Sequence, residues 1–406
     1  MSGPMNGTIR TAFAAGPDIA AAVGECRDRL AMAPPDLLLA FIGGRHDRHA
    51  ALAALRAGFG DVPLAGGSSA GVIAAEASGY SGFEIGLVGF AGAAVTPRLV
   101  TAHGLQEDEI AAGARLGRAV RDEAAEDAVV LLLFDSVKSA PPPELHPAGW
   151  IMDGFRAGLG ASRMHVIGGG LLTDINLSDG WMFDGAGIAK HAASALIFPA
   201  GLQAASAILH GCRPVSSFLT ITRVEGAEVF ELDGEPALTV IERRLGLALG
   251  STSGRELSLV ATLGQNRGDP FAPFDEKNYV NRLILTANPE QGSVTLFEPD
   301  FVAGTRVQIM SRDNILMLDS VEQGIARLKR DLVGAACELG LYIDCAGRAS
   351  VVTGATTEEA DLVAATLAPA FPFLGFYSGV EIAPFEGAES HPLDWTGVLT
   401  VLHRTA

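Results

Sequence analysis

The feature that most constrains how this chain folds is a pattern that occurs twice, with the copies 100 positions apart (156 − 56). In the first copy, Arg-Ala-Gly-Phe-Gly at 56–60 leads into Val-Pro-Leu-Ala-Gly-Gly at 62–67. In the second, Arg-Ala-Gly-Leu-Gly at 156–160 leads into His-Val-Ile-Gly-Gly-Gly at 165–170. A short apolar run precedes each copy. Each copy therefore predicts a strand, a helix, a second strand and a glycine turn.

In the first unit we expect a strand at 36–42, a helix at 46–58 and a strand at 62–66, and the second unit occupies 128–198. A third copy rests on pattern more than on identical residues. It predicts a strand at 341–345, a helix at 357–367 and a strand at 373–376. The predicted fold class is α/β, with duplicated strand–helix–strand units that form mixed sheets in two domains, and with sites at the strand ends.

The domain organisation follows from a change of pattern after Cys212-Arg213-Pro214. Residues 216–233 alternate like two paired strands, and the Asp-Gly-Glu-Pro turn that starts at Asp233 precedes a helix from Ala237 onward. The predicted divisions are an N-terminal extension at 1–34, an N-terminal domain at 35–227 and a C-terminal domain at 228–406.

Composition limits the possible partners. The net charge of −18 argues against a nucleic-acid partner, because no basic stripe could neutralise phosphates. The longest apolar segment, 192–209, is interrupted by Pro199, Gly201 and Gln203, so no membrane span is expected. The four cysteines have no Cys-x-x-Cys spacing, which disfavours a zinc site and a disulfide framework. With no apparent leader, we expect a cytoplasmic protein.

The glycine turns are the first candidates for ligand contact. Gly66, Gly67, Ser68 and Ser69 follow one strand, and Gly168-Gly169-Gly170 follows another. Glycine permits positive φ and lets a ligand approach backbone N–H groups, while the serines add hydroxyls. The alternative is that the turns serve packing alone. No nucleotide fingerprint or nucleophile elbow matches these residues.

Charged residues near strand ends are further candidates. Asp174 and Glu381 could recognise a cationic amine, although Asp174 could instead cap a turn and Glu381 could be solvated. Arg348 could bind a ligand carboxylate, or it could pair with Asp344 or Glu381 and hold its loop.

His191 begins an apolar strand, and a single His beside an apolar pocket is one way to ligate haem iron. This makes a haem-based gas sensor the alternative hypothesis, with His191 as the axial ligand. A third hypothesis is a metabolite-processing enzyme that uses Cys345 or Glu381, but no triad, metal cluster or cofactor fingerprint accompanies them.

Motifs along most of the chain resemble those of the FIST sensory family, which joins an N-terminal and a C-terminal FIST domain. The resemblance rests on six segments: Leu64–Gly71, Val166–Gly170 with Asp174, Trp181–Gly185, Cys345–Arg348, Gly375–Tyr377 with Glu381-Ile382, and His391 with Thr396 and Leu399-Thr400. Val380 and Leu171-Leu172 replace smaller residues of the family pattern, which makes the expected pocket more apolar.

The resemblance implies an intracellular small-ligand sensor rather than an enzyme. Its ligand would be a small metabolite, amino-acid-like or apolar, and a subset of the family binds haem and senses nitric oxide. The signal would pass to a separate protein, such as a histidine kinase or a cyclic-di-GMP enzyme. The predicted ligand-binding residues are Gly66, Gly67, Ser68, Ser69, Gly169, Gly170, Asp174, Arg348, Tyr377 and Glu381.

Overall fold

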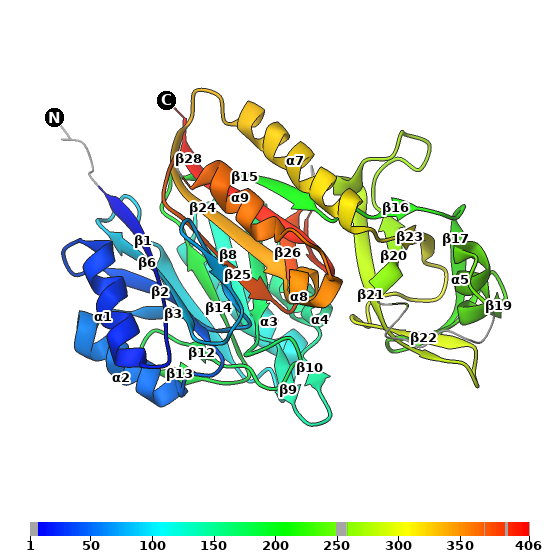
Figure 1. Ribbon diagram of the computed structural model, residues 1–406, viewed down its shortest axis with the longest axis horizontal. Helices are drawn as coiled ribbons and strands as arrows, with labels where there is room; N and C mark the ends of the chain where they lie inside the picture. Colours follow the sequence, from blue (N-terminus) through cyan, green and yellow to red (C-terminus); the bar gives the residue numbers. More distant parts are fainter. Residues whose placement is uncertain (1–6, 249–256, 258, 369, 386–388, 406) are drawn as a thin grey trace.

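The chain is built from three units that share one order of strands and helices, and a separate sheet lies beside them (Figure 1). The computed structural model describes residues 7–248, 257, 259–368, 370–385 and 389–405. The expected α/β class with mixed sheets and two family domains is confirmed. None of the described helices is long and apolar enough to cross a membrane.

Each unit contains two parallel strands joined by a connection that includes a helix, as the repeated pattern predicts. The three sets are β2 (Leu37–Gly43), α2 (Arg48–Phe59) and β3 (Leu64–Ser69); β8 (Val129–Asp135), α4 (Ala148–Leu159) and β11 (His165–Leu171); and β24 (Ala336–Cys345), α9 (Glu359–Leu367) and β25 (Phe373–Ser378).

Two antiparallel strands extend each sheet on one side, and a second helix lies beside the first. These elements are β1 (Thr8–Ala15), α1 (Ile19–Leu30) and β6 (Glu84–Ala91); β7 (Arg98–His103), α3 (Glu109–Glu123) and β14 (Ala192–Ile197); and β15 (Gln203–Leu209), α7 (Asn314–Asp331) and β28 (Gly397–Arg404).

Each sheet is completed by a hairpin from another unit. The hairpin after β3 pairs with β25, the hairpin after β11 pairs with β3, and the hairpin after β25 pairs with β11. The exchange is therefore cyclic, and all three six-stranded sheets have equivalent strand orders. The hairpins are β4 (Val72–Ala74) with β5 (Ser78–Gly79), β12 (Met182–Phe183) with β13 (Ile188–Ala189), and β26 (Glu381–Pro384) with β27 (Ser390–Leu393).

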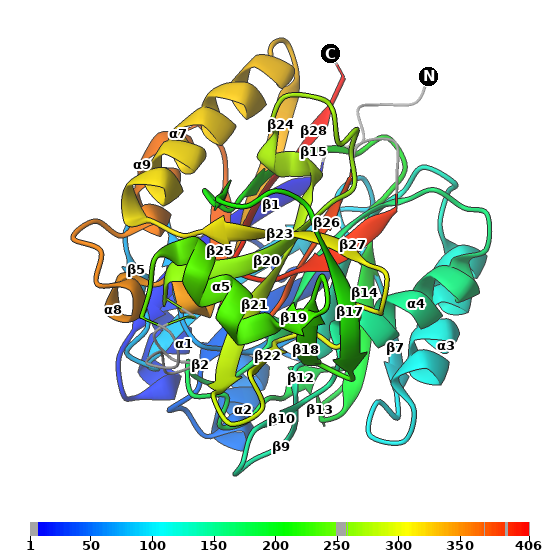
Figure 2. The ribbon, with the colours of Figure 1, turned by 90° about the vertical axis from the view of Figure 1, so that its right-hand side faces the viewer.

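Residues 213–311, here called the inserted sheet, interrupt the third unit between β15 and α7 (Figure 2). Pairing of β20 with β23 closes a ring of six strands. Its elements are β16 (Arg213–Pro214), β17 (Leu219–Glu225), β18 (Glu228–Leu232), β19 (Glu235–Pro236), α5 (Ala237–Leu245), β20 (Ala261–Asn266), η1 (Glu276–Asn278), β21 (Tyr279–Asn288), β22 (Ser293–Leu296) and β23 (Arg306–Ser311). The remaining short elements are β9 (Val137–Ser139), β10 (Glu144–Leu145), η2 (Ala346–Arg348) and α8 (Ser350–Thr353).

The three sheets share one core on their inner faces, and helices cover their outer faces. In β8, Leu131 and Leu133 enter the shared core, whereas Leu132 and Phe134 pack under α3 and α4. Because both faces of the central strands are buried, their sequences read as continuous apolar runs rather than as alternating ones. This explains why the apolar runs at 37–42 and 130–134 were clear in the sequence.

The glycines expected to form turns lie inside strands instead, because β3 continues to Ser69 and β11 to Leu171. A Cβ at Gly66, where φ is +89°, would overlap the carbonyl oxygen of Ala40, and one at Gly168 would overlap that of Leu132. Glycine is required at both positions because neighbouring backbones approach too closely for a side chain.

The predicted domain divisions can be placed on the structure without being tested by it. Residues 8–30 of the predicted extension form β1 and α1, and the predicted division between 227 and 228 falls in the β17–β18 turn. The divisions remain a prediction.

A pair of glycine substitutions tests the close approach between β8 and β11. Gly168→Ala is expected to lower the free energy of unfolding by about 1–3 kcal/mol or more, because the Leu132 backbone must move. Gly24→Ala, in α1 with no atom within 4 Å of the added Cβ, should instead be neutral or stabilise by up to about 1 kcal/mol. Chemical denaturation measures both, and equal effects would contradict this account.

Candidate functional site

Three equivalent backbone hydrogen bonds bring many of the predicted site residues together where the hairpins cross between units. Ser68 N donates to Trp181 O (3.0 Å), Gly170 N to Val380 O (2.9 Å) and Tyr377 N to Gly71 O (3.0 Å). Gly67 of β3 lies close to Leu171 of β11, and Gly169 of β11 lies close to Ile343 of β24. A Cβ at Gly67 would lie 3.1 Å from Leu171 Cδ1, and one at Gly169 would lie 2.8 Å from Ile343 Cγ2.

Side chains and backbone fill this crossing. Ser68 and Ser69 are fully buried, and their hydroxyls bond to Trp181 O and Gly71 O respectively. A Cβ at Gly170 would overlap Ser136 Oγ, so the third glycine also lies against protein. Packing thus accounts for both glycine runs, and the ligand role of Gly66, Gly67, Ser68, Ser69, Gly169 and Gly170 remains a prediction.

Asp174 is half-buried in its own loop, where its carboxylate accepts hydrogen bonds from Asn176 N (2.8 Å) and the Ser178 hydroxyl (3.1 Å). These contacts match the turn-capping alternative. The described hydrogen bonds and ion pairs do not connect Asp174 with Arg348, Tyr377 or Glu381.

Arg348 is fully buried within the protein's own polar network. Its Nε and Nη2 bond to the two oxygens of Glu359 at 2.7 and 2.6 Å, and Asp344 Oδ1 lies 3.2 Å from Nε. Nη1 donates to the carbonyls of His210 and Trp395, at 3.2 Å each. The guanidinium therefore ties η2 to α9, to the segment before β28 and to the segment after β15.

Too many carboxyl groups surround Arg348 for all of them to be ionised. Burial, followed by the charge of Glu359, raises the pKa of Asp344 well above its usual range. Burial likewise raises the pKa of Glu381, although Ser378 Oγ donates to it at 2.6 Å and Thr396 N at 3.2 Å. We therefore treat Glu359 as the principal charged partner of Arg348. Tyr377 Oη is buried near this network without a hydrogen-bond partner among the described residues.

Removal of Arg348 tests how strongly this network holds the third unit. Arg348→Met is expected to lower the free energy of unfolding by about 3–5 kcal/mol, because it leaves Glu359 buried and unpaired. Adding Glu359→Leu to this variant should recover part of the lost free energy of unfolding, because the unpaired Glu359 carboxylate is then removed as well. Denaturant titration measures both variants, and a double variant less stable than Arg348→Met would contradict the argument.

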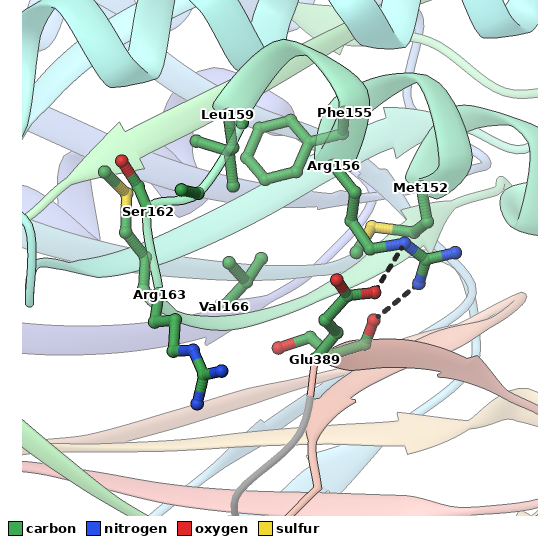
Figure 3. Close-up of a pocket in the computed structure, with 12 residues that line it drawn as sticks. Met152, Phe155, Arg156, Leu159, Ser162, Arg163, Val166 and Glu389 are labelled. Carbon is green, nitrogen blue, oxygen red and sulfur yellow. Dashed lines mark hydrogen bonds and ion pairs between the residues drawn. The ribbon is translucent and has the colours of Figure 1, made fainter.

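A cavity of about 310 Å³ opens at the carboxyl end of α4 (Figure 3). Apolar side chains from α4 and β11, namely Met152, Phe155, Leu159 and Val166, form its wall. Two arginines lie at its edge. Arg156 is held by Glu389 at 3.2 Å and by the carbonyl of Ser390 at 3.1 Å, whereas Arg163 extends away from that pair. An apolar wall with a few charged groups is typical of small-molecule sites.

Both sides of this cavity are attached to the inserted sheet. At the amino end of α4, Glu298 accepts hydrogen bonds from Ala148 N (3.0 Å) and Gly149 N (2.9 Å). On the opposite side, Arg282 donates to the carbonyl of Pro392 in β27 (3.1 Å), and Asp394 accepts from Leu283 N (3.1 Å). The cavity therefore lies between two elements that separately contact residues 282–298.

Helix α4 also packs unusually closely on α3. A Cβ at Gly154 would overlap the carbonyl oxygen of Ile110, and a Cβ at Gly113 would overlap that of Ile151. The two helix backbones are therefore in direct contact.

Glu298 is a titratable connection between α4 and the inserted sheet. Burial and then the nearby Asp394 carboxyl raise the pKa of Glu298 from 4.5 to about 8. A buried acid with a raised pKa binds its proton more tightly in the folded state. Its contribution to stability is therefore complete below pH 4.5 and is lost as pH rises to about 8.

We expect Glu298→Gln to flatten the pH dependence of stability between these limits, because glutamine does not ionise. The difference in slope between wild type and variant should reach at most about 1.4 kcal/mol per pH unit. Urea titrations at several pH values measure it. Asp394, whose pKa burial raises to about 6, is present in both proteins, so the comparison removes only the ionisation of Glu298 and its effect on Asp394. Parallel pH profiles would contradict this assignment.

His191 was the predicted haem ligand, and its surroundings do not suit that group. Its Nδ1 lies 3.0 Å from Nε2 of His146, whose Nδ1 lies 2.9 Å from Glu109. Lys138 Nζ is 3.2 Å from the same carboxylate. Haem requires a wide apolar slot, whereas these described neighbours are polar and His191 lines none of the described cavities. We therefore derive no function through haem.

Sequence reasoning missed the cavity and its attachments. Arg156 belongs to the repeated pattern, but its counterpart Arg56 bonds to backbone carbonyls and has no carboxylate partner among the described residues. Glu298 and Arg282 come from the inserted sheet, whose contact with α4 joins residues about 150 positions apart. Of Arg156, Glu298 and Arg282, the repeated pattern included only Arg156, which begins its second copy.

The chain belongs to the FIST family: the FIST N domain matches residues 36–235 and the FIST C domain residues 237–384. FIST domains are in general small-ligand sensory domains. Among curated relatives, an uncharacterized protein of Mycobacterium tuberculosis is 27% identical over 187 residues, covering 46% of this chain and 48% of that protein. One of Mycobacterium bovis is 29% identical over 195 residues, covering 46% and 47%. The match spans about half the length of these relatives.

Solved structures with low similarity include a chorismatase and cyanuric acid hydrolases. The chorismatase has a TM-score of 0.33 and 10% identity, with 99% of each chain covered. A cyanuric acid hydrolase described as the product of structural concatenation has a TM-score of 0.34 and 12% identity, covering 98% of this chain and 100% of its own. These values are too low to carry a functional argument.

Proposed function

We propose that this protein senses a small amphipathic anion that binds in the α4 cavity, and that the inserted sheet passes the signal to a separate partner. The observation that carries the proposal is the position of the cavity. Its two sides, α4 and the segment leading into β27, make separate hydrogen bonds to the inserted sheet. A molecule in the cavity would therefore contact both of the elements that are hydrogen-bonded to the inserted sheet.

The ligand class follows from the lining. Met152, Phe155 and Leu159 suit an apolar body rather than a free amino acid with two charges. Arg156 is already paired with Glu389, whereas no described acidic side chain pairs with Arg163. Arg163 is thus the group at the edge that suits a ligand carboxylate, because a guanidinium can bind both of its oxygens.

The mechanism is a population shift. A ligand between α4 and residues 389–390 favours the arrangement in which both sides contact it, and it can shift the equilibrium only by its difference in affinity for the two arrangements. The change would reach the inserted sheet through Glu298 and Arg282, which hold opposite sides of the cavity.

The signalling partner would bind the inserted sheet. Among its apolar side chains, Phe271 is 94% exposed and Val302 is 64% exposed, so both are available to a partner. A histidine kinase or a cyclic-di-GMP enzyme remains the proposed kind of partner.

Binding of octanoate, with 1-octanol as its neutral analogue, tests the ligand class. Octanoate should raise the melting temperature, and Arg163→Gln should weaken its affinity by about 10-fold, the loss of one charge-assisted contact. Arg118→Gln is the matched control, because Arg118 is also exposed in the second unit but lies on α3 outside the cavity. Calorimetry measures affinity. If octanoate fails to bind, or if the two arginine variants behave alike, the proposed site is wrong.

Hydrogen exchange tests the signal path. Octanoate should slow exchange in the peptides around 282–298 as well as in α4. Glu298→Ala should retain binding but weaken the response in the inserted sheet, because both acceptors at the amino end of α4 are removed while the Arg282 contact remains. An unchanged response in this variant would refute the proposed signal path through Glu298, but it would not contradict the ligand site.

A further inference from the structure

A second cluster of titratable side chains lies away from the α4 cavity, at the carboxyl end of β8. It is a chain of three groups: Glu109 at the start of α3, His146 before α4 and His191 before β14. The distances are 2.9 Å from Glu109 Oε1 to His146 Nδ1 and 3.0 Å from His146 Nε2 to His191 Nδ1. Glu109 and His146 are buried, whereas His191 is only half-buried.

The positions of the protons on these three side chains follow from the ionisation states of Glu109 and His146. The pKa of Glu109 is lowered despite the opposing effect of its burial, because His146 and Lys138 donate hydrogen bonds to it, so Glu109 is ionised at neutral pH. Burial lowers the pKa of His146, so its ring is neutral there. An ionised carboxylate only accepts hydrogen bonds, so His146 must donate through Nδ1. His146 Nε2 is then an acceptor, and the proton of the second bond belongs to Nδ1 of His191.

The assignment fixes the remaining nitrogen of His191. With its proton on Nδ1, a neutral ring carries its lone pair on Nε2. No described residue bonds to this nitrogen, and it is not among the buried polar atoms that lack a partner. The lone pair therefore faces solvent, and the negative charge of Glu109 acts on it through His146.

The backbone holds His191 in a conformation that a non-glycine residue rarely adopts, with φ of +50°. Its N–H donates to Asp135 Oδ2 at 2.8 Å, and its carbonyl accepts from Gly104 N at 3.0 Å and Leu105 N at 2.9 Å. Backbone strain that is fixed from both sides is found preferentially at functional sites. The ring is thus held in place before any substrate arrives.

We propose that His191 Nε2 is a nucleophile that accepts the acyl group of small activated esters, with His146 and Glu109 as its positioning residues. The Nε2 lone pair forms a bond to the ester carbonyl carbon, and the carbon–oxygen bond breaks so that the leaving group departs with its electrons. The Nδ1 proton passes to His146 Nε2, and the resulting imidazolium pairs with the Glu109 carboxylate. Water then attacks the acyl carbon and the acyl–nitrogen bond breaks, which releases the carboxylic acid. His146 returns its extra proton to His191 Nδ1, and the second proton of the water passes to the leaving group in solution, so the three side chains regain their starting protonation.

The alternative role for the solvent-facing lone pair of His191 Nε2 is to bind a cation. Among the described residues, no three His, Cys, Asp or Glu side chains gather as metal ligands. A single imidazole is a poor metal site, whereas it is sufficient as a nucleophile.

The test uses the full chain and p-nitrophenyl acetate. Wild type should release p-nitrophenolate and carry a transient acetyl group on His191, located by peptide mass spectrometry. His191→Ala should abolish both. Glu109→Gln keeps an acceptor for His146 but removes the charge. It should slow acetylation by about 10–100-fold, the size of the loss seen when the hydrogen-bond partner of a metal-ligating imidazole is removed. His49, an exposed histidine on α2, is the internal reference and should react at the same rate in every variant.

A second measurement on wild type does not depend on the folding of any variant. Nitrogen-15 NMR of the neutral His191 ring should show the proton on Nδ1 and an unprotonated Nε2. Finding the proton on Nε2 would overturn the proposal, and so would acetylation of His191 no faster than that of His49. Loss of octanoate binding in the α4 cavity would not affect either result.

Discussion

The exchange of hairpins between units is the constraint on which the rest of the structure depends. Each of the three six-stranded sheets has two strands that belong in sequence to another unit, so no sheet is complete by itself. The exchange is closed by three backbone hydrogen bonds of 2.9–3.0 Å, at Ser68, Gly170 and Tyr377. Because the strands cross there at close range, glycine and small side chains are needed, and little room is left at the centre.

This crowding explains why binding is proposed at the periphery. The strand-end crossing, where the repeated units suggested sites for a ligand, is filled by buried serines and by neighbouring backbone. The α4 cavity instead lies between a helix of the second unit and the hairpin that the third unit contributes. The Glu109–His146–His191 chain is likewise specific to one unit. The three units of this molecule therefore differ from one another in the α4 cavity and in the Glu109–His146–His191 chain.

The sequence allowed the three strand–helix–strand units to be predicted, because their central strands are buried on both faces and therefore form long apolar runs. It also indicated Arg348 and Glu381 as important, although Arg348 binds Glu359 in the structure. Pairing between units could not be predicted. Short strands such as Met182–Phe183 carry no periodic signal, and their partners lie more than 100 positions away. The closed ring of the inserted sheet was likewise indicated only by one hairpin, near Glu225-Gly226.

The direct contact of the α3 and α4 backbones limits how this protein could acquire new ligand preferences. Gly154 and Gly113 admit no larger side chain, so α4 keeps its position relative to α3 and the cavity cannot widen by separating the two helices. Variation must enter through the neighbouring segment 160–164, where Ala161 and Arg163 are exposed to solvent. Related proteins could thus retain the same helix pair and still differ in the molecules they recognise.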